Sequence, residues 1–334
     1  MARESKAKRD ARRFGRPERL ADLFGMGNWA VGDDVPPEAF RHEFVDKMRR
    51  HVAHAIGGVV IEATNVFDYC NSLDGVKQLR FREDIVNAVP PFEDCFVEFR
   101  VDSSLSPQIR HAGWAISSYV KGEESQAVYD ALMSVPCPDA YAAAKWFLVG
   151  TFTLGMYLSP DSNVMGVMCP VAQAVVLLGE NGNALLPPLL SIPEPLVPGC
   201  ADWAQLWAHA TFFSATFTFC FMNCKNVTVQ PHDPDPAINR ERRKAQLKPF
   251  VRYHTINIDP MKQVLRTEGG VESNGLKKAL HICRGHFATY TTSLMGRTLD
   301  KPVTVWKPAH VRGSAKHGVV VSDYSVKAPE EPRP

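Results

Sequence analysis

Patterns that would assign this chain of 334 residues to a known enzyme class are absent. It contains neither a paired CxxC nor an HExxH spacing, which are the usual signatures of zinc sites. Its glycine-containing turn at 179–183 does not match the loop that cradles phosphate in P-loop proteins. The sequence therefore predicts neither a metal site nor a bound cofactor.

A disulfide framework and an export signal are also lacking. The first residues do not have the pattern of a signal peptide, and the cysteines show no framework spacing. There are eight of them, at positions 70, 95, 137, 169, 200, 220, 224 and 283. Free thiols are typical of a reducing compartment, so we expect a cytoplasmic protein.

Only one apolar segment, residues 201–222, approaches the length of a membrane span. Asp202, Gln205, His209 and several serines and threonines dilute it, and no basic residues flank it. Its apolar positions recur at helical spacing. The sequence therefore predicts a buried central helix and no association with a membrane.

Charge is distributed unevenly, although the net charge is only +2. Residues 1–19 carry eight Lys/Arg against three Asp/Glu, residues 20–239 carry twelve against twenty-five, and residues 240–334 carry eighteen against eight. Such segregation indicates a basic lobe that meets a polyanion, or two lobes that attract each other. The partners to expect are nucleic acid, RNA or DNA, or an acidic protein surface; the sequence sets no oligomeric state.

The chain predicts an α+β protein with a mixed N-terminal body and a small basic C-terminal sheet. Its expected parts are a basic disordered arm (1–19), an acidic body (20–230), a basic lobe (240–313) and a partly disordered tail (314–334). The proline-rich run 231–236 is the expected hinge. Apart from the buried helix, the expected elements are helices over 34–57 and 239–248 and strands over 59–61, 95–101, 145–157, 172–178, 250–258, 279–290 and 302–306.

Residues 279–313 concentrate most of the potential chemistry. If 279–290 is a strand, side chains two apart share a face, so Arg284, His286 and Tyr290 point the same way. His310 and Arg312 are also two apart. If the two segments lie side by side, two His/Arg couples converge.

Converging couples of this kind suit metal-independent cleavage of a phosphodiester. His286 and His310 would act as the acid and the base, because the histidine pKa lies near neutrality. Arg284 and Arg312 would bind the phosphate, and Tyr290 would orient or stack a base. The same residues could instead bind nucleic acid without cleaving it, or only close the fold.

Other clusters give weaker signals. His281 and Cys283 face away from His286 in a strand, so these three do not form a metal-ligand set. His51 and His54 lie one helical turn apart, where a solvated polar face is the expected arrangement. Four carboxylates near a predicted strand are expected to form its acidic rim: Glu93, Asp94, Glu98 and Asp102.

The C-terminal motifs also carry a resemblance. The run from Asn223 to Val227, HICRGHF at 281–287, LMG at 294–296 and PAHVRG at 308–313 resemble the C-terminal signature of a family of uncharacterised proteins from bacteria, bacteriophages and mobile elements. The resemblance covers roughly the last third of the chain. Met295 stands where that pattern has phenylalanine, and Val305-Trp306 replaces an aromatic pair. The family has no established activity, so the resemblance implies only this kind of origin.

Two hypotheses of different classes follow. In the first, the protein acts on nucleic acid as a metal-independent nuclease, with RNA favoured, and shares a helix-plus-sheet plan with small ribonuclease toxins. In the second, it is a non-enzymatic binding or regulatory protein of a phage or mobile element. Fold does not decide between them.

Overall fold

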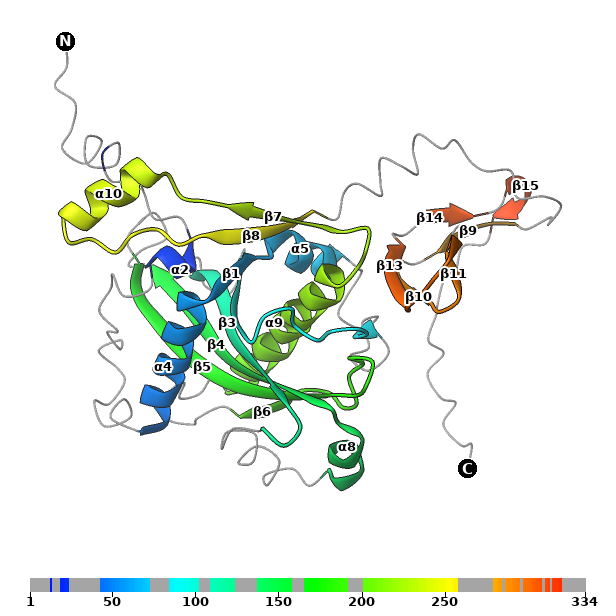
Figure 1. Cartoon of the computed structure of the whole chain (residues 1–334), viewed down its shortest axis with the longest axis horizontal. Helices are drawn as coiled ribbons and strands as arrows, with labels where there is room; N and C mark the ends of the chain where they lie inside the picture. The colour runs from blue at the N-terminus through cyan, green and yellow to red at the C-terminus, as the bar shows by residue number, and fades with distance from the viewer. Residues whose placement is uncertain are drawn as a thin grey trace, which may run out of the picture. The chain divides into compact units, whose positions relative to one another are not determined.

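The computed structural model describes residues 13, 19–23, 43–72, 84–101, 109–123, 137–157, 165–191, 201–257, 279–283, 286–294, 297–307, 310–312 and 314–319. They belong to two compact units, Met1–Ile258 and Asp259–Pro334 (Figure 1). Helices and strands both contribute, and a small sheet lies near the C-terminus, so the predicted α+β class is confirmed.

The helices of the larger unit are α2 (Leu20–Leu23), α4 (Glu43–Gly57), α5 (Thr64–Ser72), α8 (Pro138–Ala143), α9 (Ala201–Met222) and α10 (Pro236–Lys244). Its strands are β1 (Val59–Glu62), β2 (Asp94–Arg100), β3 (Ile109–Val120), β4 (Trp146–Tyr157), β5 (Met165–Leu178), β6 (Leu189–Ser191), β7 (Thr228–His232) and β8 (Tyr253–Asn257).

These strands form one eight-stranded sheet in the order β6-β5-β4-β3-β2-β1-β8-β7. Strands β2 to β6 form an antiparallel meander. Strand β1 runs parallel to both of its neighbours, β2 and β8. The centre of the parallel part is therefore β1, a strand of only four residues.

Both faces of the sheet are covered by helices (Figure 1). On one face Ala115 packs in a cluster with Leu20 of α2 and Val52 of α4. The next residue back, Trp114, points to the other face, where its ring lies 4.4 Å from that of Phe212 in α9. This alternation is the period of two expected of a strand that is buried on both sides.

Helix α9 has the bounds that the apolar periodicity predicted, and its middle is buried. Its hydroxyl groups do not need water, because each donates a hydrogen bond to a carbonyl one turn earlier. Thr211, Thr216 and Thr218 donate to the carbonyls of Trp207, Phe212 and Ser214 at 2.7–2.8 Å. A helix rich in threonine can therefore lie in the core without unsatisfied polar groups.

The second unit is built of short strands: β9 (Ala279–Cys283), β10 (His286–Tyr290), β11 (Ser293–Leu294), β12 (Arg297–Thr298), β13 (Val303–Lys307), β14 (His310–Arg312) and β15 (Ser314–Val319). Strand β10 pairs with β13 and β11 with β12, while β9 lies between β14 and β15. The predicted small C-terminal sheet is present in this form.

The expected domain boundary near residue 240 is wrong. Helix α10 and strand β8 belong to the larger unit, which ends at Ile258. The run 231–236 is no hinge: β7 extends to His232, and Asp235 caps α10 by accepting a hydrogen bond from the backbone N–H of Ala237 at 2.7 Å. Strand β8 then pairs with β1, a contact across almost 200 residues that local composition does not reveal.

Close packing between β4 and α9 predicts the effect of one methyl group. A Cβ at Gly150 would lie 2.6 Å from the ring of Phe212 and 2.8 Å from that of Trp114, both fully buried. We expect Gly150→Ala to lower the free energy of unfolding by about 1–3 kcal/mol, measured by urea denaturation. The control is Gly57→Ala at the end of α4, where nothing lies within 4 Å of the new Cβ; equal effects would contradict this packing.

Candidate functional site

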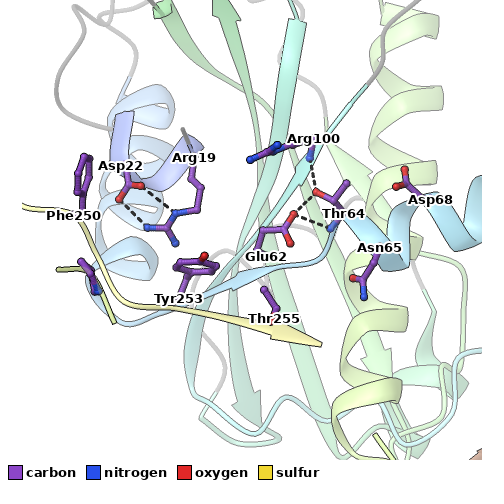
Figure 2. A pocket seen from close by; sticks show the side chains of 11 residues that line it. Arg19, Asp22, Glu62, Thr64, Asn65, Asp68, Arg100, Phe250, Tyr253 and Thr255 are labelled. Atoms are coloured by element: carbon purple, nitrogen blue, oxygen red, sulfur yellow. Dashed lines mark hydrogen bonds and ion pairs between the residues drawn. The ribbon is translucent and has the colours of Figure 1, made fainter. Parts of the chain in front are cut away.

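A cavity of about 530 Å³ lies at the carboxyl ends of β1 and β2 and beside the first half of β8. Glu62 is the last residue of β1 and Arg100 is the last of β2. Thr255 of β8 pairs directly with Glu62. The wall is completed by residues of α2, α5 and the segments around β8: Arg19, Asp22, Thr64, Asn65, Asp68, Pro234, Phe250 and Tyr253 (Figure 2).

Glu62 and Thr64 connect the end of β1 to the start of α5. The Glu62 carboxylate accepts hydrogen bonds from the Thr64 backbone N–H, at 3.2 Å, and from the Thr64 hydroxyl. The same hydroxyl accepts a bond from the backbone N–H of Arg100 at 2.9 Å. A carboxylate at a helix N-terminus is favoured by the helix dipole, so the protein itself supplies the anion at the start of α5.

Arg19 forms the opposite wall and is only 9% exposed. Its guanidinium donates two hydrogen bonds to Asp22, at 3.0 and 2.9 Å, and one to the Val251 carbonyl at 2.8 Å. Its guanidinium carbon also lies over the Tyr253 ring, 3.8 Å from the centroid. The predicted disordered arm over residues 1–19 is therefore wrong at its end, because pairing and stacking hold Arg19 in the core.

Glu98 lies behind this wall and is 2% exposed. It accepts a hydrogen bond from the backbone N–H of Ala21 at 2.8 Å, and its second oxygen lies 3.9 Å from Arg19 Nη1. Burial raises the pKa of Glu98 to about 7, against the opposing effect of the Arg19 charge. Burial also raises the pKa of Asp22, although Arg19 lowers it.

Several lining groups have no partner in the part of the chain that the structure describes. These are the Arg100 guanidinium, the Asp68 carboxylate, the Tyr253 hydroxyl and the second carboxylate oxygen of Glu62. Unpaired donors and acceptors that converge on a cavity of this size are typical of a small-molecule site. Sequence reasoning missed this site; the available signal was a polar residue at the end of each of two predicted strands, Glu62 directly after 59–61 and Arg100 within 95–101.

A second polar cluster joins α4 to the sheet. His51 bonds to Thr151 Oγ1 at 2.8 Å and to Ser117 Oγ at 2.9 Å, so the expectation of a solvated face is wrong for it. Burial lowers the pKa of His51 to about 4, which keeps the ring neutral at pH 7. Asp94 bonds to the Ser117 hydroxyl and, at 3.0 Å, to His54 Nε2.

This Ser/His/Asp cluster is not arranged as a catalytic triad. A carboxylate only accepts hydrogen bonds, so the Ser117 hydroxyl donates its proton to Asp94. His51 Nε2 must then donate to Ser117, and the ring cannot take the serine proton as a triad base does. The cluster fastens α4 to β2, β3 and β4.

The predicted site residues of the C-terminal unit lie on two neighbouring ladders. His286 is exposed on β10, where it pairs with Lys307 of β13, and Tyr290 is half-buried on the same strand. His310 and Arg312 belong to β14 and pair with Cys283 and His281 of β9. Arg284 lies outside the described residues.

Both ladders are antiparallel, and they pair described residues of 281–290 with described residues of 303–312, as the hypothesis of two converging couples requires. The histidines are not cross-strand partners, however. His286 is opposite Lys307, three positions before His310. A single site made of both His/Arg couples stays a prediction.

The chain matches no protein-family model, and no curated protein matches it. Within the described ranges no three His, Cys, Asp or Glu side chains are grouped to hold a metal ion. Among the helices that the structure describes, none has both the length and the apolar character needed to cross a bilayer.

Replacing the serine of the α4 cluster tests its structural role. Ser117→Ala leaves a buried histidine N–H and a carboxylate oxygen without their partner, so we expect about 1–3 kcal/mol less free energy of unfolding. The wild-type protein should not react with a serine-directed fluorophosphonate. The matched control is Ser118→Ala, whose hydroxyl makes only 3.4 Å contacts with carbonyls. Covalent labelling of Ser117 would contradict the proton arrangement.

The raised pKa of Glu98 predicts how stability depends on pH. The folded protein holds a proton at about pH 7 that the unfolded chain releases near the ordinary value of 4.5. The stabilisation that Glu98 gives by binding this proton is therefore fully present below pH 4.5, and it is lost as pH rises through 7. From pH 5 to pH 8, we expect the difference in unfolding free energy between wild type and Glu98→Gln to fall by about 2.5 kcal/mol.

Comparison with Glu98→Gln isolates this effect from His51. The lowered pKa of His51 gives the opposite slope between about pH 4 and 6.5, but both proteins share it. Urea denaturation at several pH values measures the difference. Parallel stability curves for the two proteins would show that Glu98 does not bind a proton on folding.

Proposed function

We propose that the protein binds nucleic acid through one face of the β10–β13 hairpin, with single-stranded RNA as the favoured ligand. The observation that carries the proposal is that the Lys307 ammonium lies 5.1 Å from the centre of the Tyr290 ring. A cation and an aromatic ring on one accessible face are the two groups that single-strand-binding surfaces combine, and both side chains here are half-buried.

The alternation of β10 supports this surface. His286, Ala288 and Tyr290 have the same parity and pair with Lys307, Val305 and Val303. The small Ala288 leaves room between the histidine and the tyrosine. We define these six positions as the hairpin face.

The other side of the hairpin is used for packing. Phe287 lies with its ring 4.7 Å from that of Trp306, which is 2% exposed. Thr289 bonds to the buried Thr304 at 3.0 Å. The hairpin face contains no fully buried residue, whereas the other side includes the buried Trp306 and Thr304.

The interaction energies favour stacking of a nucleic-acid base on the Tyr290 ring over its contact with Lys307. An exposed cation–π contact contributes about 0.5–1 kcal/mol, while stacking of a base on an aromatic side chain contributes about 1–3 kcal/mol. A base can thus displace Lys307 from the Tyr290 ring, and the freed ammonium can bind the adjacent phosphate. Residues 259–334 carry twelve Lys/Arg against seven Asp/Glu, which adds a general attraction for a polyanion.

The pairing of the two histidines favours binding over cleavage. An acid and a base that act on one phosphodiester must both reach the same phosphate, and His286 and His310 belong to separate ladders in which each has a different cross-strand partner. The two-histidine nuclease is therefore the second candidate, favoured only by the presence of both histidines on paired C-terminal strands. We also propose that the protein comes from a bacteriophage or mobile element, on the resemblance of its C-terminal motifs.

Fluorescence anisotropy with labelled single-stranded RNA and duplex DNA tests the proposal. We expect Tyr290→Leu to weaken RNA binding about 5- to 150-fold, the equivalent of one lost stacking contact. Lys307→Gln should reduce the slope of log K against log salt by about one. Lys301→Gln is the control, since it removes the same charge from an exposed position between β12 and β13.

Two results would contradict RNA binding at the hairpin face. The wild type would not bind RNA, or Lys307→Gln and Lys301→Gln would have equal effects. The same samples, incubated in EDTA and with magnesium, report cleavage. Cleavage in EDTA that disappears in both His286→Ala and His310→Ala would establish the nuclease instead. Thermal unfolding of each variant shows that it remains folded.

A further inference from the structure

The cavity lies at the carboxyl end of β1, which has a parallel neighbour on each side. Helix α5 leads from β1 to β2, and β8 pairs with the other edge of β1. In sheets with parallel strands, ligands bind outside the carboxyl ends of the strands. This position supports a binding role for the cavity, independently of the hairpin face.

The unpaired groups set the chemistry of the ligand. Glu62 and Asp68 present carboxylate oxygens, which require hydrogen-bond donors from the ligand. Arg100 presents a guanidinium, which requires an anion and pairs well with phosphate. The ligand must therefore carry an anionic group and hydroxyl or amine donors on one small frame.

The place of the anion follows from the groups that are already paired. The N-terminus of α5 is satisfied by Glu62, and Arg19 is held by Asp22 and Val251. Arg100 is left as the unpaired cation of the described lining. Figure 2 shows Glu62 between Tyr253 and Thr64, with Arg100 extending from the end of β2 toward Arg19.

We propose that this cavity binds a ribonucleoside monophosphate, with the ribose hydroxyls bonded to Glu62 and the phosphate to Arg100. A carboxylate that accepts bonds from ribose hydroxyls at the end of a parallel strand is a recurrent arrangement. Phe250 and Pro234 supply apolar lining for the base. The volume of about 530 Å³ is in the range of small-molecule sites.

Isothermal titration calorimetry on the full chain tests the assignment. The probes are the four ribonucleoside 5′-monophosphates, their 2′-deoxy forms and inorganic phosphate. We expect at least one ribonucleotide to bind, and its deoxy form to bind about 10-fold or more weakly, because a hydrogen bond to a carboxylate is lost. Inorganic phosphate should bind more weakly than the nucleotide.

Two variants separate the subsites. Arg100→Gln should weaken the nucleotide and inorganic phosphate alike, whereas Glu62→Gln should reduce the ratio between ribonucleotide and deoxynucleotide. Arg50→Gln, which removes an exposed arginine of α4 outside the cavity, is the matched control. Thermal unfolding without ligand establishes that each variant is folded.

Three results would overturn the assignment: no binding by any of the four ribonucleotides, a ribose preference that Glu62→Gln leaves unchanged, or an equal loss with Arg50→Gln. The Tyr290→Leu variant of the hairpin face should bind nucleotide as the wild type does. The experiments can therefore reject nucleotide binding in the cavity without rejecting RNA binding on the hairpin face, and the reverse.

Discussion

The buried guanidinium of Arg19 is the interaction on which the larger unit depends most. A charge that leaves water must be paired to be tolerated, and Arg19 is paired with Asp22, bonded to the Val251 carbonyl and stacked on the Tyr253 ring. Its Nη1 makes no hydrogen bond with the described residues and lies 3.9 Å from a Glu98 carboxylate oxygen. These contacts fasten the short α2 to the segment before β8. They also bring Leu20 and Ala21 into the core beside Val52.

The same interaction shapes the cavity beside it. Because Arg19 is paired with Asp22, its charge is not available to a ligand. The charged groups that can bind one in the cavity include Arg100 and Glu62. Glu98 lies behind Arg19 with a pKa raised to about 7 by burial. A group whose pKa lies near neutrality is therefore buried directly behind the wall of the cavity, although its position is set by packing and not by the ligand.

The spacing of apolar residues was enough to predict those helices and strands whose buried positions can be recognised within one short segment. The threonine-rich α9, the short β1 and the strand β13 all follow from apolar spacing, and their observed bounds lie within two residues of the expected ones. The prediction of soluble packing for α9 rested on its polar residues, and the hydroxyl bonds to backbone carbonyls give the physical reason. These features need no knowledge of distant contacts.

Long-range pairing was not predictable in the same way. The proline-rich run 231–236 has the composition of a linker, yet it contains the end of β7 and the cap of α10. Arg19 ends a basic segment that has the composition of a solvated arm. The only local sign of its ion pair is that Asp22 follows three residues later. At the C-terminus the sequence predicted two facing segments correctly, whereas the positions of His286 and His310 along them depend on a register that alternation alone does not define.

Photochemical cross-linking of the full chain to single-stranded RNA, with mass spectrometry of the attached peptides, tests the central claim most directly. The account predicts cross-links to residues between His286 and Lys307, with Tyr290 as the main site, and their loss in high salt. Cross-links confined to residues 1–258 would contradict it and would place nucleic-acid binding on the larger unit.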